Sequence, residues 1–395
     1  MKHILIIANG LTDHPVAERD NKTPLQLAET PNLDRLSQNG SCGTVRTIPH
    51  EASPENLVAY LSLMGYVGET GGAGHFSAQA LGLSLKENQV PLCCNFVILQ
   101  SSHNDMVMKD FSAGNLDSGD SKTLLDSLQK NVYDVSAEFH HGRGPHNLVL
   151  LDAGTVPEKL ISPFEIIGEG IRKFLPSDEN SKNLPFLMNQ AQIILHNHPM
   201  NRQRQKEKKD LINSIWFWGA GPAPKLAQFA DMHGGKKAVA ISYDLIFQGV
   251  AKTAGMKIAP LQEFQDDVSA NKNLADAALK ALADADVVYV HTHFAEAPSL
   301  KGMIDDKIFA IEDMDRDLIG PLAQAVELNG GVRLGIIVNQ CASVVQMKYD
   351  KEPVPFVIYP PVKEKTSAEA FDENFKLLKS EYYESAENWI KSFLN

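Results

Sequence analysis

The sequence predicts an α/β protein in which a central, mostly parallel sheet lies between helices and a smaller α+β domain is inserted into the chain. Five short apolar runs have the length and composition of strands: 4–8, 238–242, 286–293, 332–338 and 355–360. Amphipathic stretches such as 273–285 and 319–329 alternate with them, which is typical of βαβ units. The runs are apolar almost throughout, as strands buried on both faces require.

The middle of the chain has a different pattern. Residues 90–99, 133–141 and 146–154 are strand-like, but only short helical stretches separate them. Residues 174–185 form a polar, proline-containing break. We therefore expect an inserted α+β domain over residues 76–188 and a discontinuous core domain over residues 1–75 and 189–395.

Charge and cysteine usage exclude several classes of protein. A net charge of -12 argues against binding to nucleic acid, and the one basic run, 202–209, is interpreted as a solvated surface stretch. The 4 cysteines have no zinc-like spacing and are expected to be thiols in a reducing cytoplasm. The N-terminal apolar run is too short for a signal peptide, and no stretch approaches the roughly 20 apolar residues of a membrane helix. We expect a cytoplasmic protein without nucleic-acid or membrane partners.

Polar residues lie at the ends of two of the predicted strands. The loop 338–345 follows the apolar run 332–338 and contains Asn339, Gln340 and Cys341, but no carboxylate or histidine. Open α/β sheets place their chemistry at such strand ends. Cys341 could act as a nucleophile, but its nearby sequence has no histidine to activate it. His291 and His293 alternate on one strand, so they face the same side.

Several segments in order along the chain carry a resemblance to a known family. They are residues 9–15 (NGLTDHP), 23–40 (TPLQLAETPNLDRLSQNG), 63–66 (LMGY), 195–201 (LHNHPMN), 219–224 (GAGPAP), 238–242 (AVAIS), 249–256 (GVAKTAGM) and 353–355 (PVP). The chain resembles the archaeal-type, cofactor-independent phosphoglycerate mutases of the alkaline-phosphatase-like superfamily from Asn9 to about Pro355. The resemblance implies an alkaline-phosphatase-like core with an inserted substrate-binding domain.

The resemblance also implies a chemistry, the transfer of a phosphoryl group between the 2- and 3-positions of glycerate. A serine would form a phosphoenzyme, and two divalent cations (Mn, Mg or Zn) would hold the serine and phosphate oxygens. In this sequence the nucleophile position is Asn56, and the metal-ligand positions are Asn9, Glu296, Leu300, Gln340, Cys341 and Tyr349. Of these seven residues, Glu296 alone can act as an anionic carboxylate ligand.

The phosphate-binding arginines that the resemblance implies are also replaced. The residues at their positions are Ala73, Phe111, Asn115, Asn147 and Trp218. Arg143, Arg202 and Arg204 remain as basic groups in the same segments. Charge has thus been removed from both sides of the site, from metal ligands and from anion-binding arginines.

We interpret the chain as a family member that has lost phosphotransfer, a pseudoenzyme with a binding or scaffold role. The alternative is an active phosphoglycerate mutase, or a related phosphatase or phosphotransferase, with a rebuilt metal site. We expect no cofactor, and a neutral hydrogen-bond network among Asn9, Asn56 and Gln340. The candidate residues of a residual pocket are Asp13, His75, His291, His293, Glu296 and Cys341.

Alternatives remain open for individual residues. Ser53 could replace the lost nucleophile after a three-residue slip, or it could be a residue of the turn that starts a helix. His291 and His293 could bind one zinc ion with His75 or Glu296, or they could be hydrogen-bonded residues at a strand end. Asp13 and His14 resemble a catalytic pair, but Asp13 matches a turn residue of the family, which favours structural capping.

The C-terminal stretch departs from the family pattern. Residues 370–395 have the pattern of one amphipathic helix, whose apolar side would contain Phe371, Phe375, Leu378, Tyr382, Trp389 and Phe393. Such a helix could pack on its own domain. It could also dock an unknown protein partner or a second copy of the chain.

Overall fold

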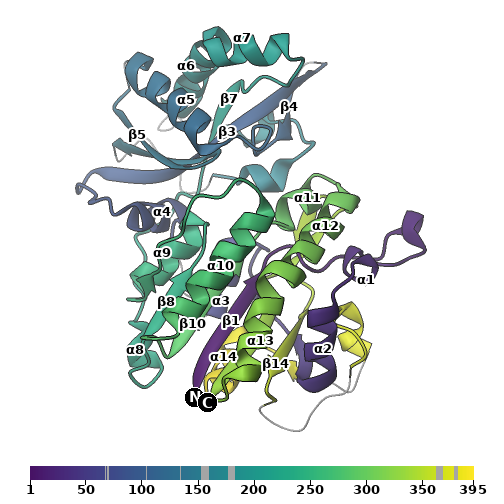
Figure 1. Cartoon of the computed structure of the whole chain (residues 1–395). Coiled ribbons are helices and arrows are strands. Elements are labelled where there is room, and N and C mark those ends of the chain that lie inside the picture. Colours follow the sequence, from purple (N-terminus) through teal and green to yellow (C-terminus); the bar gives the residue numbers. More distant parts are fainter. Residues whose placement is uncertain are drawn as a thin grey trace. The chain divides into compact units, whose positions relative to one another are not determined.

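The chain forms two compact units in a computed structural model that describes residues 1–66, 68, 71–103, 105–133, 135–152, 160–176, 183–361, 368–377 and 381–395 (Figure 1). The core unit contains Met1–Glu69 and Leu226–Asn395, and the inserted unit contains Thr70–Lys225. The inserted unit therefore begins earlier and ends later than the expected 76–188. The boundary at 188 would cut helix α6 (Asn183–Asn197) and would separate strand β7 (Ser214–Trp218) from its partner β3 (Gln89–Ser102).

The core unit is built on a mostly parallel sheet, as the sequence predicts. Among the described residues its strand order is β15-β2-β14-β11-β1-β10-β8-β9. The bounds are β1 (Lys2–Ala8), β2 (Ser41–Val45), β8 (Ala238–Ile241), β9 (Lys257–Ile258), β10 (Val287–Thr292), β11 (Val332–Val338), β14 (Val354–Tyr359) and β15 (Glu381–Tyr383). All five predicted strands form, and β14 is antiparallel to both of its neighbours.

Strand β1 lies in the middle of this sheet because its apolar residues find partners on both sides. It runs parallel to β10 and β11, so that Ile4 lies between Val288 and Leu334. Residues 4–8 are completely buried. The carboxyl ends of these three parallel strands consequently meet at one edge of the sheet, which is where such folds place their sites.

Helices pack around this sheet (Figure 1). The helix α10 contacts β10 and α13 contacts β11, whereas α3 contacts α9 and α14. Their bounds are α1 (Pro24–Leu27), α2 (Pro31–Asn39), α3 (Asn56–Leu63), α8 (Phe229–Met232), α9 (Leu245–Thr253), α10 (Asp267–Ala281), α11 (Glu296–Leu300), α12 (Ile304–Met314), α13 (Gly320–Leu328) and α14 (Ala386–Leu394). Within the part of the chain that the structure describes, no helix is long and apolar enough to cross a membrane.

The prediction of one continuous C-terminal helix is wrong. The segment forms a 3-10 turn (Glu373–Leu377), the edge strand β15 and then α14, because residues 381–383 pair in parallel with β2. Trp389 and Phe393 are fully buried, and their rings stack with centroids 5.4 Å apart. Phe371 and Phe375 are also buried, Tyr382 is exposed, and Leu378 lies outside the described residues. The apolar face of α14 therefore packs within its own unit.

The inserted unit is an α+β domain with an antiparallel sheet. Strand β3 pairs with β4 (Asp105–Asp110), β6 (His146–Asp152) and β7, and β6 also pairs with β5 (Ala137–Arg143). Its helices are α4 (Ala73–Leu81), α5 (Ser118–Asn131), α6 and α7 (Pro199–Lys206). A separate apolar core that includes Phe96, Leu124 and Leu187 supports this unit.

Candidate functional site

The strand-end cluster consists of Asn9, Asn56, Glu296, Asn339, Gln340 and Tyr349, all in the core unit. Asn9 directly follows β1, and Asn339 and Gln340 follow β11. Asn56 and Glu296 are the first residues of α3 and α11. The fold therefore brings together residues that are far apart in the sequence, and five of the seven nucleophile and ligand positions meet here.

A glycine allows the close approach between the first strand and α11. Gly10 has a φ of +75°, and a Cβ atom at this position would lie 2.6 Å from the Glu296 Cα. Any side chain would collide with the start of α11, and the positive φ is itself unfavourable for residues other than glycine. Gly10 thus allows Asn9 to reach Glu296.

The Glu296 carboxylate is the centre of the cluster. Its Oε1 accepts hydrogen bonds from Asn56 Nδ2 at 2.7 Å, from the Tyr349 hydroxyl at 2.9 Å and from Asn9 Nδ2 at 3.4 Å. Burial raises the pKa of Glu296 to about 7, and these hydrogen bonds partly oppose that shift. The carboxyl group therefore changes its charge near neutral pH.

Asn56 is held from both ends of its carboxamide. While its nitrogen donates to Glu296, its Oδ1 accepts from Gln340 Nε2 at 2.8 Å and from Asn339 Nδ2 at 2.9 Å. Of the network expected among Asn9, Asn56 and Gln340, the bond between Gln340 and Asn56 forms, whereas Asn9 is joined to Asn56 only through Glu296. The network is incomplete at the oxygens: among the described residues, the buried atoms Asn9 Oδ1, Asn339 Oδ1 and Gln340 Oε1 have no hydrogen-bond partner.

His291 lies behind the cluster and is already satisfied. Its Nδ1 is 2.7 Å from Ser242 Oγ, and its Nε2 is 3.1 Å from the Tyr60 hydroxyl, which in turn accepts a hydrogen bond from Asn9. Burial keeps the pKa of His291 well below its ordinary value, so the ring is neutral. With both nitrogens engaged, His291 is not placed to bind the zinc ion considered from the sequence.

The other sequence-predicted residues have different surroundings. The His293 ring stacks on His291 with centroids 5.6 Å apart. His75 lies on α4 of the inserted unit, and burial lowers its pKa. Leu300 is a fully buried apolar residue of α11. Ser53 is exposed and precedes α3.

Asp13 has a structural role, as its turn position suggests. Its Oδ2 accepts a hydrogen bond from Lys307 Nζ at 2.7 Å, and both side chains are completely buried. The same oxygen accepts from the Val344 backbone at 3.0 Å. Asp13 therefore joins the turn after β1 to the loop that contains Gln340 and Cys341.

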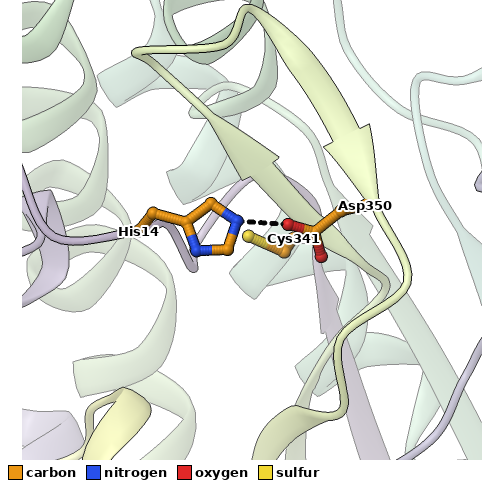
Figure 2. Close-up of side chains that lie close together, drawn as sticks. All are labelled: His14, Cys341 and Asp350. Atoms are coloured by element: carbon orange, nitrogen blue, oxygen red, sulfur yellow. Dashed lines mark hydrogen bonds and ion pairs between the residues drawn. The ribbon is translucent and has the colours of Figure 1, made fainter.

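His14 was not expected to take part in a site, yet it has two chemically relevant neighbours. Figure 2 shows the thiol of Cys341 beside the contact between His14 Nε2 and Asp350 Oδ2. One ligand-type atom from each of these three residues lies within 4.8 Å of the other two. Nothing in the local sequence indicates this, because His14 and Asp350 are 336 residues apart.

Comparison with known proteins decides the family. A model described as 2,3-bisphosphoglycerate-independent phosphoglycerate mutase matches residues 37–201. A probable 2,3-bisphosphoglycerate-independent phosphoglycerate mutase of Geobacter sulfurreducens is 32% identical over 362 residues, which cover 91% of this chain and 90% of the relative. The chain belongs to this mutase family. The corresponding mutase of Methanosarcina mazei is 30% identical over 379 residues, covering 94% of both chains.

Solved structures support the fold of this phosphoglycerate mutase family member. The structure of the protein PH0037 from Pyrococcus horikoshii matches with a TM-score of 0.72 at 21% identity, covering 100% of this chain and 96% of that one. A cofactor-independent phosphoglycerate mutase of Thermoplasma acidophilum matches with a TM-score of 0.54 at 22% identity, covering 100% and 99%. These similarities confirm the predicted α/β architecture.

Family membership corrects one expectation. We expected no cofactor, and this is wrong, because the chain belongs with cofactor-independent phosphoglycerate mutases, a class that uses divalent metal ions. The strand-end cluster itself does not fit the pair of cations that the resemblance implies. It contains one carboxylate, toward which three neighbours direct hydrogen-bond donors, and Leu300 offers no ligand atom. A metal ion in this chain therefore requires a different set of ligands.

Proposed function

We propose that this member of the phosphoglycerate mutase family has lost serine-dependent phosphotransfer and acts as a binding or scaffold protein. The observation that supports this most directly is Asn56 at the nucleophile position, with both ends of its carboxamide occupied by hydrogen bonds. A carboxamide cannot form the phosphoenzyme. Loss of a covalent nucleophile costs several orders of magnitude in rate.

The inserted unit supports the same proposal, because positions expected to hold phosphate-binding arginines serve packing and hydrogen bonding. Phe111 is buried and meets Phe164 edge to face at a centroid distance of 4.8 Å. Asn147 is buried and donates to Ser121 Oγ at 3.1 Å. The Trp218 indole donates to Asn95 Oδ1 at 2.9 Å. These side chains provide no fork of charged donors for a phosphate group.

The direct test is an assay of 2- and 3-phosphoglycerate interconversion by the purified full chain with Mn, Mg or Zn. We expect no turnover above that of the buffer and no acid-stable phosphoprotein. Turnover that disappears in Glu296→Ala, Asn56→Ala or Ser53→Ala would overturn the proposal. Turnover that is identical in all three variants would come from a contaminating enzyme, which repurification would remove.

The rival function is phosphoglycerate mutase activity through a rebuilt site. It is favoured by the names of relatives that are about one-third identical along nearly the whole chain. The two functions differ in what the protein does to phosphoglycerate. A binding protein releases it unchanged, whereas a mutase equilibrates the 2- and 3-isomers. The proposed scaffold role also requires a partner protein or a second copy of the chain. The apolar face of α14 is buried within its own unit and is not available to bind that partner.

A further inference from the structure

Three side chains with metal-binding chemistry meet beside the strand-end cluster. His14 follows the first strand, Cys341 belongs to β12 (Cys341–Ser343), and Asp350 belongs to β13 (Lys348–Asp350) (Figure 2). We propose that His14, Cys341 and Asp350 bind a single thiophilic divalent transition metal ion, for which Zn²⁺ is the best match. This inference does not depend on whether the chain has lost phosphotransfer.

The β12–β13 hairpin places two of the ligands opposite each other. Cys341 and Asp350 are direct partners in the antiparallel pair. Side chains at such positions project to the same face with Cβ atoms roughly 5 Å apart. His14 closes the group through its contact with Asp350 Oδ2. A nitrogen, a sulfur and an oxygen atom thus lie within 4.8 Å of one another.

These distances are close to what zinc requires. Metal–ligand distances of about 2.0 to 2.3 Å in a tetrahedral site place ligand atoms roughly 3.3 to 3.7 Å apart. Small movements of the side chains would therefore place the three ligand atoms at three corners of a tetrahedron. The side chains of His14 and Asp350 are 36% and 26% exposed, so an ion can enter from solvent and water can provide the fourth ligand.

The backbone around the three residues is fixed before any metal binds. Lys307 is completely buried, and its Nζ donates to Thr12 O at 3.1 Å, Asp13 Oδ2 at 2.7 Å and Ala342 O at 2.9 Å. The Ala342 amide also donates to Thr12 O at 3.3 Å. Lys307 therefore ties the turn that carries His14 to the strand that carries Cys341, which reduces the ordering cost of binding.

The electrostatics disfavour a nucleophilic role for Cys341. Burial, and secondarily the nearby Asp350 carboxylate, hold the pKa of the Cys341 thiol well above its ordinary value. A neutral, buried thiol is a poor nucleophile. A bound zinc ion deprotonates a coordinating thiol. One Zn²⁺ with a thiolate, a carboxylate and a neutral imidazole has no net charge, which suits a largely buried site.

The ligands of the proposed site differ from those of the two-cation site that the family resemblance implies. Cys341 stands at one of those ligand positions, but His14 and Asp350 do not. The proposed site is also separate from the strand-end cluster in its contacts. Gln340 donates a hydrogen bond to Asn56, whereas the sulfur of the next residue, Cys341, lies 3.8 Å from Thr12 O. The proposed ion would therefore be a single one, displaced from the family positions.

The test uses Co²⁺ and Zn²⁺ salts with the full, reduced chain. We expect one equivalent of Co²⁺ to bind and to produce a thiolate-to-cobalt charge-transfer absorption that Zn²⁺ abolishes. Cys341→Ser should remove this absorption, and His14→Gln and Asp350→Asn should each weaken binding at least tenfold. Cys42→Ser is the matched control, because Cys42 is another buried free thiol of the core unit. Glu296→Gln tests whether the ion binds at the strand-end cluster instead.

Each of the following results would overturn the proposal: no saturable binding of one equivalent, an absorption that persists in Cys341→Ser, or binding that is lost in Glu296→Gln. Circular dichroism of each metal-free variant establishes that it is folded. His14 is partly exposed, so His14→Gln should fold normally even if Cys341→Ser does not. If folded His14→Gln binds Co²⁺ as tightly as the native sequence, that result alone contradicts the proposed site.

Discussion

Gln340 and Cys341 are adjacent in the chain, but their side chains belong to two regions with opposite chemistry. Gln340 joins the strand-end cluster, in which neutral amides and a tyrosine surround one carboxyl group. Cys341 joins His14 and Asp350, and the neighbouring turn contains the buried Asp13–Lys307 ion pair. One loop thus separates a region with one carboxyl group among neutral side chains from a region that contains an ion pair, a histidine and a further carboxyl group.

The difference shows two ways of satisfying buried polar groups. In the strand-end cluster the carboxamides bond to one another, and burial favours the uncharged form of Glu296. In the second region the Asp13 carboxyl group instead accepts hydrogen bonds from Lys307 Nζ and from the Val344 backbone amide. Removing a partner should therefore cost most where the charges remain.

The largest effect is expected for Lys307→Met. Methionine fills similar space but leaves Asp13 buried without its cation, which costs about 3 to 5 kcal/mol of unfolding free energy. Urea unfolding followed by fluorescence would measure this loss. Lys391→Met removes an exposed i,i+4 ion pair with Glu387 and should cost less than about 0.5 kcal/mol. A loss below about 1 kcal/mol for Lys307→Met would mean that the Asp13–Lys307 ion pair does not stabilise the folded chain.

A second prediction concerns pH and Glu296. Its folded pKa is raised from an ordinary value near 4.5 to about 7, so the native state binds more protons than the unfolded state between these values. The stability contributed by this group is therefore fully present below pH 4.5 and is lost as pH rises through about 7, by at most about 3 kcal/mol. Unfolding free energies from pH 4.5 to 8 should fall for the native sequence and change less for Glu296→Gln.

Asp244 has the same sign of pKa shift, to about 6, and remains in both proteins. The difference between the native sequence and Glu296→Gln therefore isolates Glu296. If the two pH profiles are parallel, Glu296 has an ordinary pKa, and the strand-end cluster is charged at neutral pH. That result would remove the main contrast between the two regions.

A third prediction concerns metal-linked stability. If Zn²⁺ binds His14, Cys341 and Asp350, a free concentration of 100 times the dissociation constant should stabilise the chain by about 2.7 kcal/mol. Chelator should reverse the gain, and Cys341→Ser should not show it. The gain should decline in acid, because protons compete for the ligands. Equal stabilisation of Cys341→Ser would place the ion elsewhere.

The sequence was sufficient for the central sheet because its strands are apolar on both faces, and the predicted run 4–8 is indeed completely buried between two parallel partners. The family segments also gave the register that brings Asn9, Asn56, Glu296, Gln340 and Tyr349 together. Antiparallel β14 could not be distinguished from a parallel strand, since both are apolar. The C-terminal helix was mispredicted because pairing of residues 381–383 with β2 overrides local periodicity.

The remaining features of the site depend on contacts between distant residues. His14 and Asp350 meet only because the turn after β1 lies against the β12–β13 hairpin. Tyr60 looks like a core aromatic residue in the sequence, yet its hydroxyl joins Asn9 to His291. No periodicity or spacing rule identifies such residues, because each is defined by a partner in another element.

The smallest predicted effect comes from Tyr349→Phe, and its pH dependence makes it informative. The Tyr349 hydroxyl donates to Glu296 Oε1 at 2.9 Å. Its removal should cost about 1.5 kcal/mol at pH 8, where Glu296 is ionised, and less at pH 5, where the carboxyl group is protonated. The pKa of Glu296 should consequently rise further. Tyr383→Phe is the control, because the Tyr383 hydroxyl donates to Glu381 and bonds to Ser392, away from the cluster. Equal losses for Tyr349→Phe at both pH values would show that its hydroxyl does not sense the charge on Glu296.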